Sequence, residues 1–598
     1  MILPLTYSKG LSVAFPRPYG QMTLDLTNGT VCVQVSGLPH EQGFDVWLVG
    51  NRPNLGRNLK LEAGDAAIRV GALKHGQGAA TLRSQLGHEV LTDFTLVRVA
   101  VTRAAEASGE GGILFGVLSL FQRLYYSELG DAQGARGLNP LFPSLVSAPS
   151  HALIPSSTHA KAPEGAPDFR SKLEALIAYG EFIFFHETFN GNGRTCGTCH
   201  RAENNFTIDP TFIATLPPDD PLFVAEFNPA LADLEQPELL RKFGLIRVNA
   251  DGFDDLPNKF VMRGVPHLLS LSTSLASGSN VPPLQRTGWG GDGAPGNGTL
   301  REFPIGAIRQ HFTKSLHRLA GVDFRLPNDA ELDALEAFQL SLGRHAELSL
   351  PLPLKDPMAR LGQEIYLDDA LGKCNLCHAN AGATAAFSHF PLGINENFST
   401  GVENLPHHPA RQVYPNMPRD GGFGLTPNGD RRGGFGNGTF NTPPLIEAAA
   451  TGPFFHNNAV HTLEDAVNFY NSAAFNTSPS GSRVRIDLTP TQVLAVATFL
   501  RVINVQENIR SAIEKAKMAQ QARGVRQEER VLSISRAEIG HAIRVLEAGK
   551  LHASAVMHLK IARVLLAAAS PVPSGPVRDT LINLAVKQQD IARRHLME

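Results

Sequence analysis

Cysteine and histidine recur in the same arrangement at two places in this chain. The pattern C-x-x-C-H occupies residues 196–200 and again residues 374–378, and together the two runs use four of the five cysteines. Two thiols spaced in this way can each bond to one vinyl group of a single porphyrin, and the histidine that follows can place an imidazole nitrogen on the iron. The sequence therefore predicts two covalently bound c-type haems.

The expected attachment residues are Cys196, Cys199, Cys374 and Cys377. His200 and His378 are the expected proximal ligands of the two irons. The alternatives are a zinc site built from paired cysteine knuckles, or two thioredoxin-like pairs. Zinc knuckles usually lie closer together along a chain, and neither alternative explains a histidine directly after both pairs, so two haems are the favoured interpretation.

Composition sets limits on the partners and the location. The chain has 598 residues, 42% of them hydrophobic, and a formal net charge of −2, which gives no indication of a nucleic-acid partner. No apolar run approaches the ~20 residues that span a bilayer, so we expect no transmembrane segment. The first seven residues lack the pattern of a signal peptide. Because c-type haem is normally attached outside the cytoplasm, we still expect a periplasmic or otherwise extracytoplasmic location.

The sequence before the haem motifs has a β pattern. Residues 20–102 alternate apolar and polar side chains, and Asn28-Gly29 supplies a hairpin turn, which predicts a small β-sandwich. Residues 112–128 have the pattern of a helix. We therefore expect a β-rich N-terminal domain over 1–135 and a linker rich in Pro, Ser and Ala over 136–169.

The haem motifs lie in two similar segments, 170–345 and 346–505. Each has an apolar helix, a C-x-x-C-H run, a long loop and a closing helix, which is typical of a duplicated cytochrome c unit. Residues 506–598 have helical periodicity with charged faces. The expected fold class is mainly α, with two tandem cytochrome c-like haem domains between the β-sandwich and a helical extension.

Three further runs come after the second haem motif: N-T-P-P-L at 441–445, T-G-P-F-F-H-N at 451–457 and T-L-E-D-A-V at 462–467. Together with the haem motifs they resemble the second-haem signature of bacterial diheme cytochrome c peroxidases and the related MauG enzymes, over residues 170–505. The resemblance implies an oxidoreductase. Its first haem would take hydrogen peroxide, and its second would receive electrons from a small redox protein, a c-type cytochrome or a cupredoxin.

The resemblance also implies residues around the first haem. Trp289 stands where the family has an aromatic side chain between the haems. Thr313 stands where a glutamate serves the bound peroxide, and a threonine cannot act as that base. The nearby candidates are His311, Gln310 and Glu302, and His311 has the best ordinary pKa for proton transfer near neutrality.

The distal ligand of the first iron also departs from the family pattern. Many family members close the first haem with a histidine from a loop soon after the motif, but no histidine occurs between His200 and His267. We therefore expect this haem to lack a loop histidine. Met262 is the nearest alternative ligand, or it is an ordinary core residue.

Tyr470 is the expected distal ligand of the second iron, or it is a helix tyrosine buried at the haem edge. It lies fourteen residues after His456, where many peroxidases have a ligating methionine and MauG has a tyrosine. A phenolate stabilises ferric iron, whereas a thioether favours ferrous iron. Met417, His407 and His408 are competing ligands.

A calcium ion between the haem domains is a further feature of the family. Thr451 and Pro453 match positions whose backbone carbonyls contribute to it, but Gly264 stands where an asparagine is expected. Since calcium takes six to eight oxygen ligands, the loss of one weakens this prediction.

These residues support three hypotheses about function. The first is reduction of hydrogen peroxide with electrons from a small redox protein. The second is oxidation of an organic or protein substrate, as MauG and the diheme rubber oxygenases perform. The third is a non-enzymatic electron carrier that holds two haems.

Overall fold

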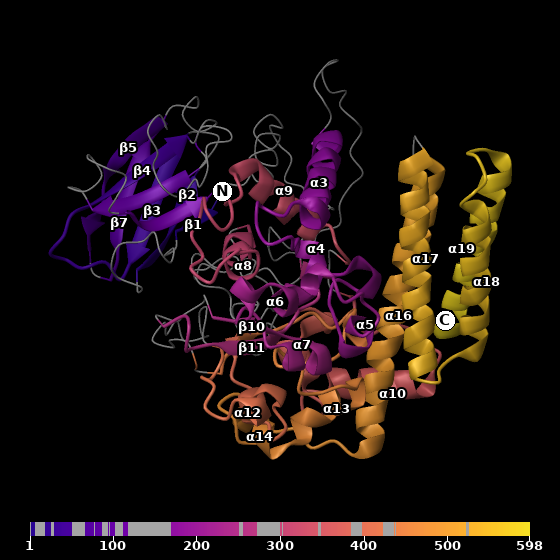
Figure 1. Ribbon diagram of the computed structural model, residues 1–598. Helices are drawn as coiled ribbons and strands as arrows, with labels where there is room; N and C mark the ends of the chain where they lie inside the picture. The colour runs from indigo at the N-terminus through magenta and orange to yellow at the C-terminus, as the bar shows by residue number, and fades with distance from the viewer. Residues whose placement is uncertain are drawn as a thin grey trace.

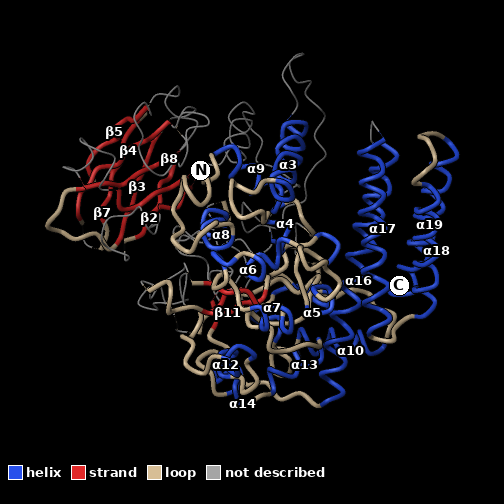
Figure 2. The backbone as a smooth tube through the Cα atoms, viewed as in Figure 1, coloured by secondary structure: helices blue, strands red, loops and turns tan. Residues whose placement is uncertain are grey.

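The computed structural model describes much of the chain from residue 2 to residue 598. The described residues lie within 2–117, with gaps, and in 169–249, 255–271, 300–344 (without 302), 348–383, 397–421, 436, 438–521 and 525–598. Trp289, Glu302 and the expected linker up to residue 168 lie outside them. Figure 2 shows that the described part is mainly helical, with antiparallel sheet concentrated near the N-terminus.

Two antiparallel sheets form the N-terminal part. The five-stranded sheet has the order β1 (Ile2–Leu5), β2 (Tyr19–Leu24), β3 (Thr30–Ser36), β7 (Ala80–Gln85), β6 (Lys74–His75). The four-stranded sheet has the order β5 (Ala66–Ala72), β4 (Phe44–Gly50), β8 (Leu96–Val101), β9 (Gly112–Val117). Alternate residues such as Val31, Val33 and Val35 are buried, and they share one core with Phe44 and Val99 of the other sheet. The period-two pattern gives the five-stranded sheet one buried face, whereas consecutive residues are buried in β4, β8 and β9 of the four-stranded sheet.

The prediction of a helix over residues 112–128 is wrong for residues 112–117. Residues 112–117 form β9, which pairs with β8 and places Leu114 opposite Val99. An apolar run of this length fits a buried strand as well as a helix, so pairing with a neighbouring strand decides its structure. Cys32, the cysteine outside the haem motifs, is a half-buried free thiol in β3.

The first haem segment is built from short helices around two longer ones. The longer helices are α3 (Phe169–His186) and α9 (Asp329–Leu340). Between them lie α4 (Cys196–Cys199), α5 (Pro210–Ile213), α6 (Val224–Phe227), α7 (Pro237–Phe243), β10 (Leu245–Val248), β11 (Val261–Gly264) and α8 (Phe303–His311). The first haem motif thus occupies a single helical turn after α3.

The second haem segment repeats this order. It begins with α10 (Pro357–Leu367) and ends with α16 (Pro490–Gln521). Between them lie α11 (Cys374–Cys377), β12 (Asn397–Phe398), α12 (Pro409–Val413), β13 (Phe440–Asn441), α13 (Leu463–Asn468), α14 (Ala473–Asn476) and α15 (Gly481–Val484). The second haem motif is again one helical turn, after α10.

The two segments share one close helix crossing. A Cβ added at Gly180 of α3 would lie 1.9 Å from the carbonyl oxygen of Ala334 in α9. A Cβ added at Gly362 of α10 would lie 1.9 Å from the carbonyl oxygen of Ala495 in α16. In both cases the added Cβ would also lie 2.9 Å from the Cβ of a phenylalanine. This phenylalanine comes four residues further along the partner helix. Only glycine allows the backbones to approach so closely, and the shared contact supports a duplicated unit.

The C-terminal helices stand beside the second haem segment (Figure 1). The helix expected to close that segment near Val502 runs on to Gln521, and α17 (Val525–Ala548), α18 (Ala553–Ala569) and α19 (Pro576–Leu596) come after it. A buried ion pair between Glu528 and Arg578 joins α17 to α19. The extension is therefore continuous with the helix that closes the second haem segment.

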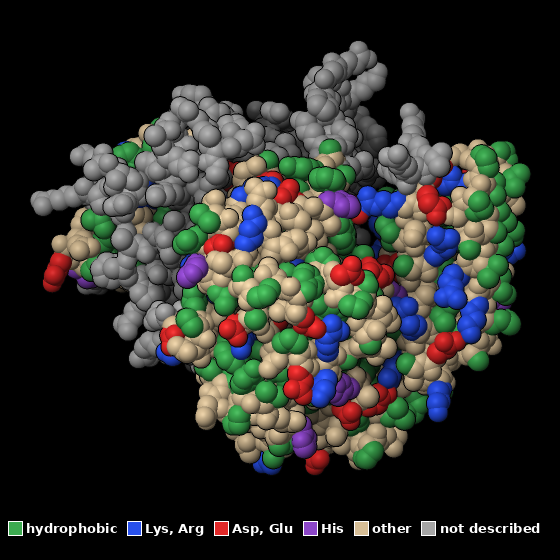
Figure 3. Space-filling model, viewed as in Figure 1, with side chains coloured by type: hydrophobic (Ala, Val, Ile, Leu, Met, Phe, Trp, Pro, Cys, Tyr) green, Lys and Arg blue, Asp and Glu red, His purple; other side chains and the backbone are tan. Residues whose placement is uncertain are grey.

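The outer surface of these helices carries both basic and apolar side chains (Figure 3). On α18, Met557, Ile561 and Val564 are exposed at helical spacing, whereas Leu559 and Leu566 on the same helix are buried. Among the described residues no helix has the length and apolar character needed to cross a membrane.

The shared crossing gives a first prediction. Gly180→Ala and Gly362→Ala should each lower the free energy of unfolding of the haem-loaded protein by about 2–3 kcal/mol, because the new methyl group overlaps a backbone carbonyl. Gly540→Ala is the control. In α17 the nearest atom to its added Cβ lies 3.8 Å away, so the free energy of unfolding of this variant should rise by up to about 1 kcal/mol. Urea unfolding measures these free energies. Equal values in the three variants would contradict the close helix crossing at Gly180 and Gly362.

Candidate functional site

Each C-x-x-C-H run lines its own cavity. The first cavity has a volume of about 160 Å³, the second has a volume of about 430 Å³, and each is lined by both cysteines and the histidine of one run. Apolar side chains form much of the walls: Phe184, Leu268, Leu271 and Leu335 in the first cavity, and Leu445, Val467, Val496 and Leu500 in the second. The structure thus brings together the six residues predicted to hold two haems.

His200 is oriented by a hydrogen bond to the backbone. Its Nδ1 lies 2.9 Å from the carbonyl oxygen of Phe206, so Nδ1 carries the proton and Nε2 is the nitrogen available to a metal. Burial lowers the pKa of His200 to about 4, so the ring is neutral near pH 7. A neutral imidazole whose second nitrogen is tied to a carbonyl is the usual form of a metal-ligating histidine.

His378 has the same arrangement in the second cavity. Its Nδ1 lies 2.9 Å from the carbonyl oxygen of Pro443, and burial lowers the pKa of this histidine to about 4. The Tyr366 hydroxyl donates to the His378 carbonyl at 2.5 Å. Two cysteines within one helical turn, an oriented imidazole and apolar walls fit a covalently held haem in each cavity.

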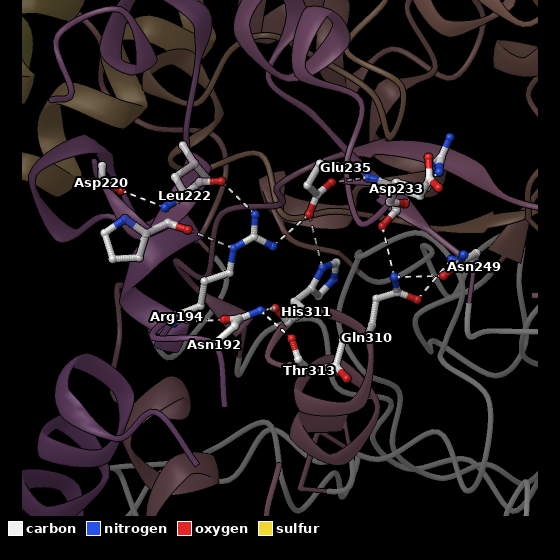
Figure 4. Close-up of polar contacts among 12 residues, drawn as sticks. Asn192, Arg194, Asp220, Leu222, Asp233, Glu235, Asn249, Gln310, His311 and Thr313 are labelled. Carbon is white, nitrogen blue, oxygen red and sulfur yellow. Dashed lines mark hydrogen bonds and ion pairs between the residues drawn. The ribbon is translucent and has the colours of Figure 1, made fainter. Parts of the chain in front are cut away.

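A charged cluster lies beside the first cavity (Figure 4). Glu235, which has no exposed side-chain area, accepts hydrogen bonds from Arg194 at 2.8 Å and from the Arg247 backbone N–H at 2.7 Å. Burial alone would raise the pKa of the Glu235 carboxyl, but Arg194 and then His311 hold it below its usual range. The cluster therefore contains a buried carboxylate that stays ionised.

His311, predicted as the base, lies at the end of α8 and lines the first cavity. Its Nδ1 is 3.8 Å from Oε1 of Glu235. Burial lowers the pKa of His311, and Glu235 partly opposes this shift. The ring is thus neutral near pH 7, and a fixed carboxylate is close enough to stabilise it when it accepts a proton.

Gln310 also lines the first cavity, but its amide is engaged by the backbone and side chain of neighbouring residues. Its Oε1 accepts from the Asn249 N–H at 3.0 Å, and its Nε2 donates to Asn249 Oδ1 at 3.1 Å. An amide held in this way can brace α8 against the end of β10. It has no titratable group with which to move a proton.

Thr313 does not line the cavity. Its hydroxyl donates to the Ser315 carbonyl, and its own carbonyl accepts from Asn192 Nδ2 at 2.9 Å. The position that carries a glutamate in the resembling family is thus used here to fix the chain after α8.

Two residues that the sequence did not indicate belong to these sites. Glu235 lies in no motif, and only the fold brings it to Arg194 and His311. His267 is the one described residue that lines both cavities, and it is buried. A lone histidine after a proline carries no sequence signal for such a position.

Tyr470, the expected ligand of the second iron, lines the second cavity. Its ring packs against Phe475 with 4.9 Å between centroids, and burial raises the pKa of its hydroxyl. The competing ligands lie elsewhere: Met417 is in an apolar core cluster, His407 is exposed, and His408 contacts Glu403. These three do not line the second cavity.

Met262, considered as a ligand of the first iron, is buried in the same core cluster as Met417 and does not line the first cavity. The expected calcium ligands Thr451 and Pro453 both line the second cavity. Beside Gly264, the Asn458 amide fills the space that a side chain would need, with Oδ1 2.1 Å from an added Cβ. The calcium site therefore stays a prediction, as does the role of Trp289, which lies outside the described residues.

Comparison with known proteins gives structural similarities of low score. No protein-family model and no curated protein matches the chain. A MauG-like protein associated with microbial copper homeostasis matches with 15% identity over 59% of this chain and 94% of its own, with a TM-score of 0.28. The diheme peroxidase BthA from Burkholderia thailandensis E264 matches with 16% identity over 55% and 85%, with a TM-score of 0.29. Hydrazine synthase from Kuenenia stuttgartiensis matches with 14% identity over 59% and 98%, with a TM-score of 0.27.

These TM-scores are too low to support an argument about family or function. Any assignment of function to this chain therefore rests on the two cavities and the residues that line them.

The cavities predict the attachment of two haems. Cys196→Ser/Cys199→Ser should carry one covalent haem instead of two, and Cys374→Ser/Cys377→Ser should do the same, because each variant loses the thiols of one cavity. Cys32→Ser should keep both haems, since this thiol lies in β3. The intact mass and the haem absorbance per chain measure the outcome, and two haems in either double variant would contradict the assignment.

Proposed function

We propose that this chain is a two-haem c-type oxidoreductase that reduces hydrogen peroxide at the first cavity. Electrons would come from a small redox protein, a c-type cytochrome or a cupredoxin, through the second cavity. One observation carries the proposal: His311 lines the first cavity and lies 3.8 Å from the buried carboxylate of Glu235, which Arg194 holds. The second cavity also has a histidine beside a buried carboxylate, His456 with Glu403, but Tyr470, the expected iron ligand, lines that cavity as well. When bound, the haems supply the iron centres that exchange electrons with the peroxide.

Proton transfer is the part of this reaction that the protein must perform. Cleavage of the peroxide bond needs a base that takes a proton from one oxygen and returns it to the other. His311 is neutral near pH 7 because burial lowers its pKa. Glu235 can stabilise the protonated ring, and Arg194 keeps that carboxylate ionised and in place.

Electron supply is assigned to the second cavity. Tyr470 lines it and would give the second iron a hard oxygen ligand, which favours the ferric state and a low reduction potential. His267 lies at both cavities, and Trp289 is the proposed aromatic relay between the haems. Calcium at the Thr451 and Pro453 carbonyls and a periplasmic location belong to the same proposal.

A second candidate function is oxidation of an organic or protein substrate at the first haem. Two observations favour it: Tyr470 lines the second cavity, and Thr313 is fixed away from the first. Tyr470 stands where MauG has a tyrosine, and Thr313 stands where the peroxidases have a glutamate. Steady oxidation of a reduced c-type cytochrome on addition of peroxide supports the first function, and its absence with rapid reaction of the ferric protein supports the second.

The His311–Glu235 pair predicts the pH dependence of the reaction with peroxide. His311→Gln should slow that reaction about 100-fold or more, as the loss of a general base does. Since Glu235 raises the pKa of His311, Glu235→Gln should lower it further and move the acid limb of the rate profile to lower pH. Stopped-flow rates between pH 4 and pH 8 measure both effects.

His317→Gln is the control for this experiment, because His317 is exposed on the loop after α8. Its rate and its pH profile should equal those of the unsubstituted protein. An unchanged rate in His311→Gln would remove this residue as the base. An acid limb that stays in place in Glu235→Gln would remove the pairing.

Tyr470 predicts the potential of the second haem. Tyr470→Phe should raise the reduction potential of one of the two haems and change its ferric spectrum, because the oxygen ligand is lost while the ring still fits against Phe475. Tyr414→Phe is the control, since its hydroxyl accepts from Gln236 outside both cavities. Potentiometric titration checks the result, and identical titrations of the two variants would exclude ligation by Tyr470.

A further inference from the structure

Three buried side chains with metal-binding chemistry converge beside the second cavity. Glu403 lies in the 3-10 turn Val402–Asn404, His408 directly precedes α12, and His456 comes from a distant loop. All three are buried, and His456 also lines the second cavity. They form the one group of three or more such side chains found among the described residues.

The distances within this cluster suit a shared ion. The Nε2 of His456 lies 2.7 Å from Glu403 Oε1, and the Nε2 of His408 lies 3.5 Å from the same oxygen. The three ligand atoms all lie within 4.8 Å of one another. Ligand atoms held at 2.0–2.2 Å from one metal ion are about 3–3.5 Å apart, so small side-chain movements would place these three around one centre.

The surrounding residues orient the ligands. The other carboxylate oxygen of Glu403 accepts from Arg411 at 3.0 Å and from the Asp420 N–H at 3.2 Å, which leaves Oε1 directed at the histidines. Phe440 stacks on the His456 ring, with 3.8 Å between centroids and an angle of 19°. Such outer contacts fix the ligands of a metal site.

The charges around the cluster also favour a cation. The neighbouring Arg263 is already matched by Asp420 in a buried pair with contacts of 2.5 and 2.7 Å. The guanidinium that contacts Glu403 is that of Arg411, and the Arg411 side chain is 24% exposed.

His408 is poorly satisfied without a further ligand. Its side chain is 1% exposed, and its Nδ1 has no hydrogen-bond partner in the described part of the chain. Its Nε2 is 3.5 Å from Glu403, longer than the ~2.7–3.2 Å of an ordinary N–H···O hydrogen bond. Burying a polar group without a good partner destabilises a protein, and a metal ion would give Nε2 a closer partner than the Glu403 oxygen.

We propose that Glu403, His408 and His456 bind one divalent transition-metal ion, separate from the two haem irons. Two imidazoles and one carboxylate are typical ligands of zinc and of non-haem ferrous iron. The proposal does not depend on the function proposed above, because it concerns a different set of side chains and predicts a stoichiometry.

The test is the metal content of the haem-loaded protein. After treatment with a chelator, the protein is dialysed against micromolar zinc chloride, and zinc and iron are measured by mass spectrometry relative to covalent haem. We expect one zinc for every two haems, and a melting temperature that rises with zinc concentration, as for any ligand of the native state. Protein that retains no zinc, with an unchanged melting temperature, would overturn the proposal.

Variants assign the zinc to this cluster. His408→Asn and Glu403→Gln should lose the bound zinc and the rise in melting temperature while keeping two covalent haems. His407→Asn is the matched control, since this neighbouring histidine is exposed and should keep one zinc. Retention of zinc by His408→Asn, or its loss in His407→Asn, would place the metal elsewhere. If His408→Asn fails to fold, the zinc titration of the unsubstituted protein still decides.

Discussion

The hydrogen bond from each motif histidine to a backbone carbonyl is the constraint on which both cavities depend. It places the proton on Nδ1 and leaves Nε2 as the nitrogen that could bind a haem iron. In the first cavity the acceptor is Phe206, six residues away, and in the second it is Pro443, 65 residues away. The first ring is therefore oriented by a local turn. The second depends on how the run 441–445 packs, which explains why that run belongs with the second haem motif.

The two haem segments share one helix arrangement, but their cavities have different electrostatic environments. Burial makes both motif histidines neutral, so burial alone does not distinguish the cavities. The difference comes from the side chains that the loops bring in. At the first cavity Arg194 pairs with Glu235, and one histidine, His311, lies 3.8 Å from that carboxylate. At the second cavity Glu403 contacts two histidines, His408 and His456. In the second cavity Tyr470 stays protonated among phenylalanines unless a metal takes its oxygen.

Local pattern in the sequence was sufficient for helices α3, α9 and α10 and for strands β4 and β8, because spacing and periodicity are local properties. It was insufficient where long-range contacts decide. Pairing with β8 makes residues 112–117 a strand, and packing against α17 extends α16 to Gln521. Glu235 and His267 carry no motif. His408 was weighed as a haem ligand from its type alone, whereas burial against Glu403 gives it a different partner.

The helix crossings also determine what each haem segment is coupled to. Gly180 and Gly362 fix the same backbone approach, but the partner helices differ in length. In the first segment α9 ends at Leu340, and its core remains separate. In the second segment α16 continues, and one hydrophobic core runs from Leu354 through α16 to Leu596 at the end of α19. Because Val496 and Leu500 of α16 also line the second cavity, a disturbance of the C-terminal helices has a direct packing route to the second cavity.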